Sequence, residues 1–368
     1  MESSITLVGS PSRRRKTPIL NHEWMELVSL GRQSIYEKEN SDTKPTGPPG
    51  LGVGRWANTP VPGNRLVTET ATTNPENNLA PGESSPVEPM MRAGESLREA
   101  SVQTTLLTAK IKTRIGTWNI RTLYEAGKSA QVSREVHRYN LKMLGLCEKR
   151  WNDTGRTRLT SGDTIIYSGY EEGHPHLHGV ALLLTPEAAQ ALLSWEPVSP
   201  RLLTARFNSK GRKVTVIQCY APTNAAETEE KEAFYEQLQA VMDKLPRRDL
   251  KILMGDLNAK VGADNTNREL VMGKHGVGVQ NENGELLTEF CTFNDLVIGG
   301  TVFQHKQIYK TTWTSPDGRT VNQIDHVTIG RKWRRSLLDV RVKRGADAAS
   351  DHHLVVADLK VKLKVYRD

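Results

Sequence analysis

The stretch Lys251–Gly262, KILMGDLNAKVG, decides how the rest of the chain is interpreted. Its short apolar run, ended by Gly255, is typical of a buried strand rather than a helix. Asp256 and Asn258 follow the run, and two residues at this spacing in an extended chain point the same way. The carboxylate can accept a proton from water and the carboxamide can donate to an anionic oxygen. The structural alternative is an Asx turn that closes the strand.

The composition indicates a basic chain without a disulfide framework. Its 368 residues allow two or three domains, and 50 Lys and Arg against 42 Asp and Glu give a formal net charge of +8. That charge favours a polyanionic partner. Three cysteines without CxxC spacing are typical of a reducing compartment, and the sequence shows neither a secretion signal nor a membrane-spanning apolar run. We therefore expect a soluble protein, nuclear or otherwise cytoplasmic, not secreted and without a membrane partner.

Residues 1–108 differ in composition from the rest of the chain. Pro, Gly, Ser, Thr, Asn and Glu dominate, and few apolar residues recur at any period. Such a segment cannot bury enough apolar surface to offset the entropy lost on ordering, so we expect a disordered Pro/Gly/Ser-rich extension with a transient helix near His22–Leu30. For its basic cluster, Arg13–Lys16, nuclear import, nucleic-acid contact and a solvated charge run are all open interpretations.

Residues 109–366 have the pattern of one α/β domain, with many strands and few interspersed helices. The predicted helices are 129–139, 227–245 and 285–293, and in the second of these apolar residues recur at helical spacing. The predicted strands are 114–120, 141–148, 164–169, 179–185, 213–222, 251–256, 295–300, 309–315, 323–330 and 353–363.

Several of these strands end at a polar residue that can do chemistry. The residues are Asn119, Glu148, Tyr220, Asp256, Asp325 and the run Ser350–His353. Packing explains such a set poorly, because buried charges need partners or a metal ion. The set is consistent with phosphodiester hydrolysis. In that interpretation Glu148 binds a hard divalent cation, and Asp256 holds and deprotonates a water molecule. His352, steadied by Asp325, polarises the phosphate or passes a proton.

Six short motifs, in a fixed order, resemble those of a known superfamily. They are TWN (117–119), LCE (146–148), CYAPTN (219–224), GDLNA (255–259), NQIDH (322–326) and SDHH (350–353). In this order they resemble the endonuclease/exonuclease/phosphatase superfamily. Longer segments such as IGTWNIRTLYEAGK and SPDGRTVNQIDH resemble the endonuclease domain of RTE-type LINE retrotransposons, which craniofacial development protein 2-like cellular proteins share. The resemblance covers residues 111–363. It implies a DNase I-like, two-sheet α/β sandwich that binds Mg²⁺ or Mn²⁺ at one end of its strands.

The resemblance also implies roles for individual residues. Asn119, Glu148 and Asp351 match metal-site positions; Tyr220 and Asn258 match phosphate contacts; Asp256 matches the water-activating aspartate; and Asp325 matches the partner of the catalytic histidine, His352. His353 is expected to face the other way in extended chain.

Two further residues are candidate DNA contacts. Trp313 matches an aromatic residue near the DNA-facing surface, where it can wedge into a groove or stack on a base. The alternative for Trp313 is a half-buried strand tryptophan. Arg334 lies in the run RKWRR (331–335), which either touches the phosphate backbone or faces water.

The sequence departs from its relatives at two places. Many relatives have Gln or Ser before the metal-site glutamate and Thr after it, where this chain has Cys147 and Lys149. Lys149 puts a cation beside the cation-binding Glu148, so it either weakens metal affinity or reaches a DNA phosphate. Abasic-site enzymes carry an acid where this chain has Arg121, which argues against that specificity and makes Arg121 another candidate DNA contact.

The leading hypothesis is a Mg²⁺- or Mn²⁺-dependent DNA endonuclease that leaves a 3′-hydroxyl nick and uses no small-molecule cofactor. One alternative is a catalytically weakened nucleic-acid or chromatin-binding module, suggested by Lys149. Another is a phosphatase or phosphodiesterase on the same fold.

Overall fold

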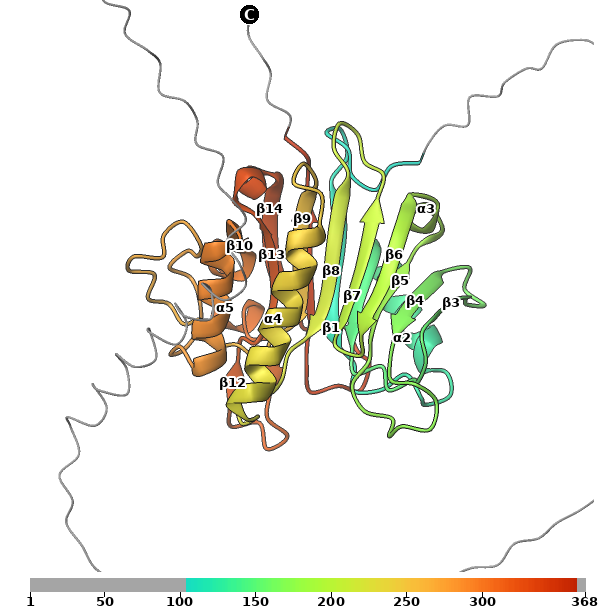
Figure 1. The fold of residues 1–368 in the computed structure, drawn as a ribbon, viewed down its shortest axis with the longest axis horizontal. Coiled ribbons are helices and arrows are strands. Elements are labelled where there is room, and N and C mark those ends of the chain that lie inside the picture. Colours follow the sequence, from blue (N-terminus) through green and yellow to red (C-terminus); the bar gives the residue numbers. More distant parts are fainter. Residues whose placement is uncertain (1–103, 363–368) are drawn as a thin grey trace, which may run out of the picture. The chain divides into compact units, whose positions relative to one another are not determined.

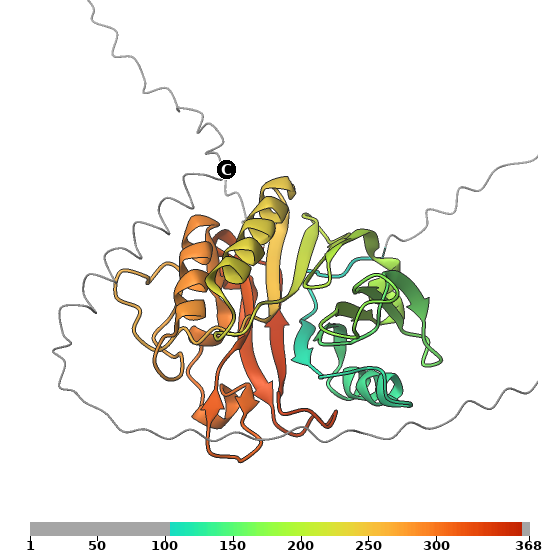
Figure 2. The same ribbon diagram turned by 60° about the horizontal axis from the view of Figure 1, so that its bottom comes forward.

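The protein is described by a computed structural model that covers residues 104–362. Within them, two mixed sheets pack face to face and helices cover their outer faces (Figure 1, Figure 2). The prediction of a two-sheet α/β sandwich is confirmed. Residues 1–103, with the predicted helix near His22–Leu30 and the basic cluster Arg13–Lys16, lie outside the described residues, as does the end of the predicted domain after residue 362.

The strands are ordered as follows in the described part of the chain. The seven-stranded sheet has the order β14 (Leu337–Lys343), β15 (Leu354–Leu359), β1 (Thr113–Asn119), β2 (Leu141–Cys147), β5 (Val180–Leu184), β4 (Thr164–Ser168), β3 (Gly155–Arg158). The six-stranded sheet has the order β10 (Leu296–Ile298), β13 (Asp325–Gly330), β9 (Leu250–Asp256), β8 (Val214–Tyr220), β7 (Leu202–Phe207), β6 (Leu192–Ser199). A small third sheet pairs β11 (Trp313–Thr314) with β12 (Val321–Asn322).

Helices lie on both outer faces of the sandwich. The α-helices are α2 (Lys128–Arg138), α3 (Pro186–Gln190), α4 (Thr228–Lys244) and α5 (Glu282–Phe293), and the 3₁₀ helices are η1 (Gly299–Thr301), η2 (Gln307–Tyr309) and η3 (Arg331–Ser336). Helices α4 and α5 lie side by side over the six-stranded sheet, whereas α2 packs against the seven-stranded sheet (Figure 1). Among the described residues, no helix combines the length and the apolar character that crossing a bilayer requires.

The two sheets approach closely where the central strands face each other. A Cβ at Gly145 of β2 would lie 1.8 Å from Oε1 of Gln218 on β8, so a larger residue there would displace the Gln218 amide. The Gln218 amide in turn donates to Thr117 Oγ1 at 3.3 Å and to Cys147 Sγ at 3.2 Å. These contacts tie the sheets together directly beneath the strand ends that carry the polar residues.

Strand direction brings the predicted site residues to one edge. Strands β1 and β2 are parallel, and so are β8 and β9, so each pair ends at the same level, with Asn119 opposite Cys147 and Tyr220 opposite Asp256. Strand β13 runs antiparallel to β9 and begins at Asp325, opposite Asp256. Carboxyl ends of parallel strands meet at one rim of a sheet, where sites are commonly built.

Three predictions about elements were wrong. The predicted strand 309–315 shrinks to β11, Trp313–Thr314. Strands β3, β6, β7 and β14 were not predicted. In β3, β6 and β14, polar and charged residues on exposed faces hide the apolar pattern, whereas β7 is almost entirely buried despite its Thr and Arg. The predicted disordered extension ends too late: Leu106 and Leu107 are buried in the core, and the Leu106 N–H donates to the Asn208 carbonyl at 2.9 Å.

Candidate active site

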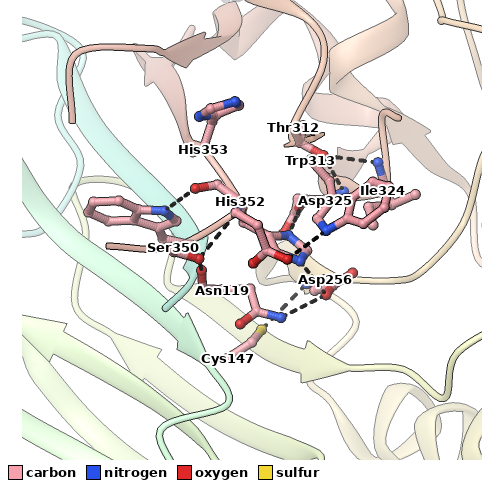
Figure 3. Close-up of polar contacts among 12 residues, drawn as sticks. Asn119, Cys147, Asp256, Thr312, Trp313, Ile324, Asp325, Ser350, His352 and His353 are labelled. Carbon is pink, nitrogen blue, oxygen red and sulfur yellow. Dashed lines mark hydrogen bonds and ion pairs between the residues drawn. The ribbon is translucent and has the colours of Figure 1, made fainter. Parts of the chain in front are cut away.

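Side chains from separate strands form one connected network. The Asn119 amide donates to Glu148 Oε1 at 2.8 Å and to Asp256 Oδ2 at 3.0 Å. The Tyr220 hydroxyl donates to the same Glu148 oxygen at 3.1 Å. His352 continues the network, with Nε2 lying 3.8 Å from Asp256 Oδ2 (Figure 3). Residues spread from 119 to 352 in the sequence therefore share one small site.

His352 is held between two carboxylates. Its Nδ1 lies 2.9 Å from Asp325 Oδ2, and both side chains are buried. Burial alone lowers the pKa of His352, but the charges of Asp325 and Asp256 outweigh it and raise the pKa above that of a free histidine. The ring is thus a protonated donor at neutral pH. His353 points away from the carboxylates, with its Nε2 3.3 Å from Thr314 Oγ1 (Figure 3).

Asp256 is a buried carboxyl group with an altered affinity for protons. Burial and the nearby charge of Asp325 raise its pKa, although His352 and the Asn119 hydrogen bond act in the opposite direction. A raised pKa makes an ionised carboxylate a stronger base near neutral pH. Asp256 Oδ1 also accepts the backbone N–H of Asn258 at 3.0 Å, so both of its oxygens are oriented.

The backbone leaves the strands in an unusual conformation at three places in the site. Arg121, Glu148 and Asn258 have φ values of 61°, 54° and 49°, in the left-handed region that non-glycine residues seldom adopt. Each lies one or two residues beyond the end of a site strand. Such conformations cluster at functional sites and persist where surrounding contacts impose them. At Asn258 one contact is the side-chain amide, which donates to the Ala221 carbonyl at 2.9 Å.

Several positioning residues were not predicted from the sequence. Thr312 Oγ1 accepts the Asp325 backbone N–H at 3.1 Å, and Cys147 Sγ accepts that of Asp256 at 3.4 Å (Figure 3). Ser350 Oγ accepts the His352 N–H at 3.1 Å and donates to the Asn119 carbonyl at 2.7 Å. Ser350 and Cys147 lie within the motifs SDHH and LCE, which indicated their place but not this positioning role, whereas Thr312 lies in none of the six motifs.

Trp313 contacts Asp351. Its indole Nε1 donates to Asp351 Oδ2 at 3.0 Å, and the ring is half-buried (Figure 3). Asp351 Oδ1 is buried without a hydrogen-bond partner and lies 3.9 Å from Arg121 Nε. Trp313 therefore orients Asp351, and its predicted contact with DNA stays a prediction.

The donor set fits a hard divalent cation. Buried carboxylate oxygens on Asp325 and Asp351 have no hydrogen-bond partner, and Glu148 supplies a third carboxylate. Oxygen ligands of this kind are those that Mg²⁺ and Mn²⁺ prefer. The side-chain NH₂ group of Asn119 donates to Glu148 and Asp256, while its side-chain oxygen Oδ1 accepts the Arg121 N–H at 3.0 Å. Its predicted role as a metal ligand requires that oxygen.

A second group of ligand-type atoms lies within 4.8 Å of one another, on Asp256, Asp325 and His352. A protonated imidazole has no lone pair for a metal ion. Because the flanking carboxylates keep His352 protonated, its single positive charge offsets one of their two negative charges. Glu148 and Asp351, which match metal-site positions in the sequence, are the residues that would hold a cation.

The prediction that Lys149 reaches a DNA phosphate was wrong. Its side chain is fully buried, and its ammonium donates to the Trp151 carbonyl at 2.5 Å and lies 4.7 Å from the Tyr167 ring centroid. Burial lowers the pKa of Lys149 to about 7. The cation beside Glu148 is instead Arg150, whose Nη2 lies 3.2 Å from Glu148 Oε2.

Two other predicted DNA contacts occupy different places. Arg121 is exposed at the site. Arg334 is exposed in η3, which follows the far end of β13. Since β13 runs from Asp325 to Gly330 at about 3.4 Å per residue, Arg334 is not brought to the same phosphate as His352.

Comparison with known proteins agrees with this geometry. A profile of the Endonuclease/Exonuclease/phosphatase family matches residues 116–352. The chain belongs to that family. Craniofacial development protein 2 from Bos taurus is 40% identical over 251 residues, which are 68% of this chain and 41% of the relative. The match to this relative thus spans less than half of the relative's length.

Solved structures of other proteins share the fold. The 3′-5′ exonuclease NExo from Neisseria meningitidis has a TM-score of 0.52 at 20% identity, covering 67% of this chain and 100% of that chain. NExo described as a 3′ phosphatase bound to a product DNA hairpin has a TM-score of 0.50 at 19% identity, covering 67% and 99%. At these identities the likeness establishes the fold alone.

Proposed function

We propose that this protein is a Mg²⁺- or Mn²⁺-dependent DNA endonuclease that hydrolyses a phosphodiester bond and leaves a 3′-hydroxyl. One observation carries the proposal: Glu148, Asp256 and His352 join one hydrogen-bonded and ion-paired network. The basic net charge of +8 favours a polyanionic substrate. Membership of a family named for nucleases and phosphatases supports the same reaction class.

Each residue has a chemical task in this reaction. Asp256, once ionised, accepts a proton from the attacking water, whose oxygen bonds to phosphorus as the P–O3′ bond breaks. His352, protonated and held by Asp325, donates a hydrogen bond to a phosphate oxygen and offsets the growing negative charge. Glu148 and Asp351 would hold the cation, which supplies charge neutralisation at the phosphate and the leaving oxygen. In this proposal Tyr220 and Asn258 orient the phosphate, which takes the place of their present acceptors, Glu148 for the Tyr220 hydroxyl and the Ala221 carbonyl for the Asn258 amide.

A plasmid-nicking assay with titrated Mg²⁺ or Mn²⁺ tests the proposal. We expect the full chain to convert supercoiled plasmid to the nicked form only with the metal, and His352→Ala and Asp256→Asn to lose at least two orders of magnitude in rate. His353→Ala is the matched control, because its ring faces away from the carboxylates. The proposal fails if wild type does not nick, or if His352→Ala nicks as fast as His353→Ala.

The chemistry of the nick is a separate readout. A 3′-hydroxyl primes a DNA polymerase directly, whereas a 3′-phosphate requires prior dephosphorylation. We expect nicks made by the wild-type chain to be extended without phosphatase treatment. Extension only after phosphatase treatment would contradict the assigned bond cleavage.

A second candidate, a nucleic-acid-binding module with weak catalysis, is favoured by the contacts that both Glu148 oxygens already make. Arg150 occupies Glu148 Oε2, and Asn119 and Tyr220 occupy Oε1, so a cation must compete with these partners. Salt-dependent DNA binding without metal-dependent nicking would select this candidate. Turnover of small phosphate monoesters without DNA cleavage would instead select the phosphatase alternative.

A further inference from the structure

A cavity of about 260 Å³ opens at β14, the edge strand of the seven-stranded sheet. Three cationic side chains line it, those of Arg341, Lys343 and Arg344, together with the rings of Tyr139 and Tyr309. Its volume is far above the ~10–15 Å³ that admits one water. No carboxylate lines it.

The lining offers hydrogen-bond donors that lack acceptors. Among the described residues, the side chains of Lys343 and Arg344 make no hydrogen bond or ion pair, and neither do the hydroxyls of Tyr139 and Tyr309. Arg341 alone has an acidic partner, Asp339, at 3.3 Å. Residues that carry an ammonium, a guanidinium and two phenols line the same cavity, and these groups can donate to an anion with several oxygens.

The local charge is also concentrated. Burial lowers the pKa of Lys343, and the positive charges of Arg341 and Arg114 lower it further, while Asp358 and Asp339 act in the opposite direction. Arg138 lies behind the cavity, with its guanidinium donating to the Gly345 carbonyl at 2.9 Å. An anion bound here would relieve this repulsion.

The cavity lies along the sheet edge that leads to the candidate active site. In the β14–β15 ladder Lys343 lies opposite Leu354, two residues after His352. A bound DNA strand repeats its phosphates every ~3.4 Å along the helix axis, so phosphates flanking the scissile one are available on this side.

We propose that this cavity binds a phosphate group through Lys343, Arg344 and the hydroxyls of Tyr139 and Tyr309. In a DNA complex the group is a backbone phosphate that flanks the scissile bond. The assignment to DNA rests on the proposed function, whereas the phosphate site itself does not.

The first test measures DNA binding without cleavage. The full chain, in EDTA, is titrated with a short labelled duplex at several salt concentrations, comparing wild type with the double variant Lys343→Gln/Arg344→Gln. We expect several-fold weaker binding and a salt slope reduced by about 1 for each lost phosphate contact. The matched control is Lys210→Gln/Arg212→Gln, which removes the same charge from an exposed loop before β8, at the opposite end from Tyr220.

The second test uses inorganic phosphate alone. We expect phosphate to perturb the amide NMR signals of Lys343–Gly345 in wild type, less so in Tyr309→Phe, and not in the double variant. A second outcome is that phosphate binds to wild type while the Lys343→Gln/Arg344→Gln variant and the Lys210→Gln/Arg212→Gln control have the same affinity for the duplex. In that case the site takes a free phosphate compound, and its assignment to DNA is overturned. If the double variant equals the control in both tests, the phosphate site itself is overturned. Neither test depends on nicking, so a failure of the proposed function is separately visible.

Discussion

At the residue scale, the protonation of His352 depends on carboxylates that come from other strands. Asp325 begins β13 and Asp256 ends β9, and both flank the same imidazole. Burial would otherwise favour the neutral ring. A charged His352 is therefore a property of the assembled site rather than of the SDHH motif.

Replacing Asp325 with Asn should lower the pKa of His352. The substitution removes the closer charge, at 2.9 Å, and leaves burial, which favours the neutral ring. We expect a fall of about 1–3 pKa units, measured by ring-proton NMR titration of the metal-free protein. Asp351→Asn is the comparison and should have a smaller effect, because Asp351 contributes least among the groups that act on His352. Equal shifts in the two variants would contradict this account.

Arg150→Gln should strengthen metal binding. The substitution removes a cation 3.2 Å from Glu148 Oε2, which otherwise competes with the metal ion. Because Arg150 is partly exposed, the gain is modest, about two- to fivefold in affinity, equivalent to ~0.4–1 kcal/mol. Electron paramagnetic resonance of Mn²⁺ binding measures it without requiring catalysis. Arg156→Gln on β3 removes the same charge elsewhere and should leave the affinity unchanged; weaker Mn²⁺ binding by Arg150→Gln would refute the competition.

At the element scale, β9 brings Asp256 to the rim only because Gly255 precedes it. Gly255 has a φ of 150°, and a Cβ there would lie 1.8 Å from the Cys219 carbonyl oxygen of the neighbouring strand. Backbone cannot yield as a flexible side chain does. The glycine that marked the end of the apolar run in the sequence thus permits close pairing of β8 and β9.

Gly255→Ala should destabilise the fold by about 3 kcal/mol or more, because two paired strands must separate. Urea unfolding of the full chain measures this, and recovery of soluble protein covers the case in which the variant fails to fold. Gly330→Ala, at the end of β13, is the matched control, since the nearest atom to its added Cβ lies 3.7 Å away. Similar stabilities for the two variants would show that the strand pair tolerates the side chain.

At the scale of the whole molecule, buried histidines make stability depend on pH in two separate windows. His326 is buried, with Nε2 2.7 Å from the Ala259 carbonyl, and burial lowers its pKa. Below ~6.5, the pKa of a free histidine, the unfolded chain binds a proton that the native site excludes. The free energy of unfolding therefore decreases as the pH decreases below this value. His352 acts in the other window: its raised pKa contributes stability that is complete below ~6.5 and is lost as the pH rises through the native pKa.

The His326 contribution can be isolated by comparing variants. As the pH is lowered from neutral to below ~6.5, the free energy of unfolding of wild type should decrease more steeply than that of His326→Gln. The difference in slope should reach up to about 1.4 kcal/mol per pH unit. Chemical unfolding at each pH measures the difference. His174→Gln, which alters an exposed histidine, should keep the wild-type slope. A His326→Gln slope identical to wild type would show that the native site accepts the proton.

Local sequence determined the elements whose pattern is strong within a few residues. The amphipathic helix 227–245 and the apolar strands that end at Asn119, Glu148 and Asp256 were predictable because burial on one or both faces leaves a clear period. The ordered motifs also indicated the family and the fold. Strands β6, β7 and β14 escaped prediction because neighbours in space, rather than local pattern, complete their burial.

The sequence by itself determined which chemical groups this protein has and that they stand at strand ends. Only the tertiary structure decided which of them meet, because hydrogen bonds and charges act over a few ångströms, whereas Asn119 and Asp256, which share a hydrogen bond, are 137 positions apart in the sequence. Lys149 and Arg150 are adjacent in the sequence, yet in the folded protein the Lys149 side chain is buried and the Arg150 side chain pairs with Glu148. The tertiary structure also gathered Lys343, Arg344, Tyr139 and Tyr309 around one cavity, which no local pattern indicates.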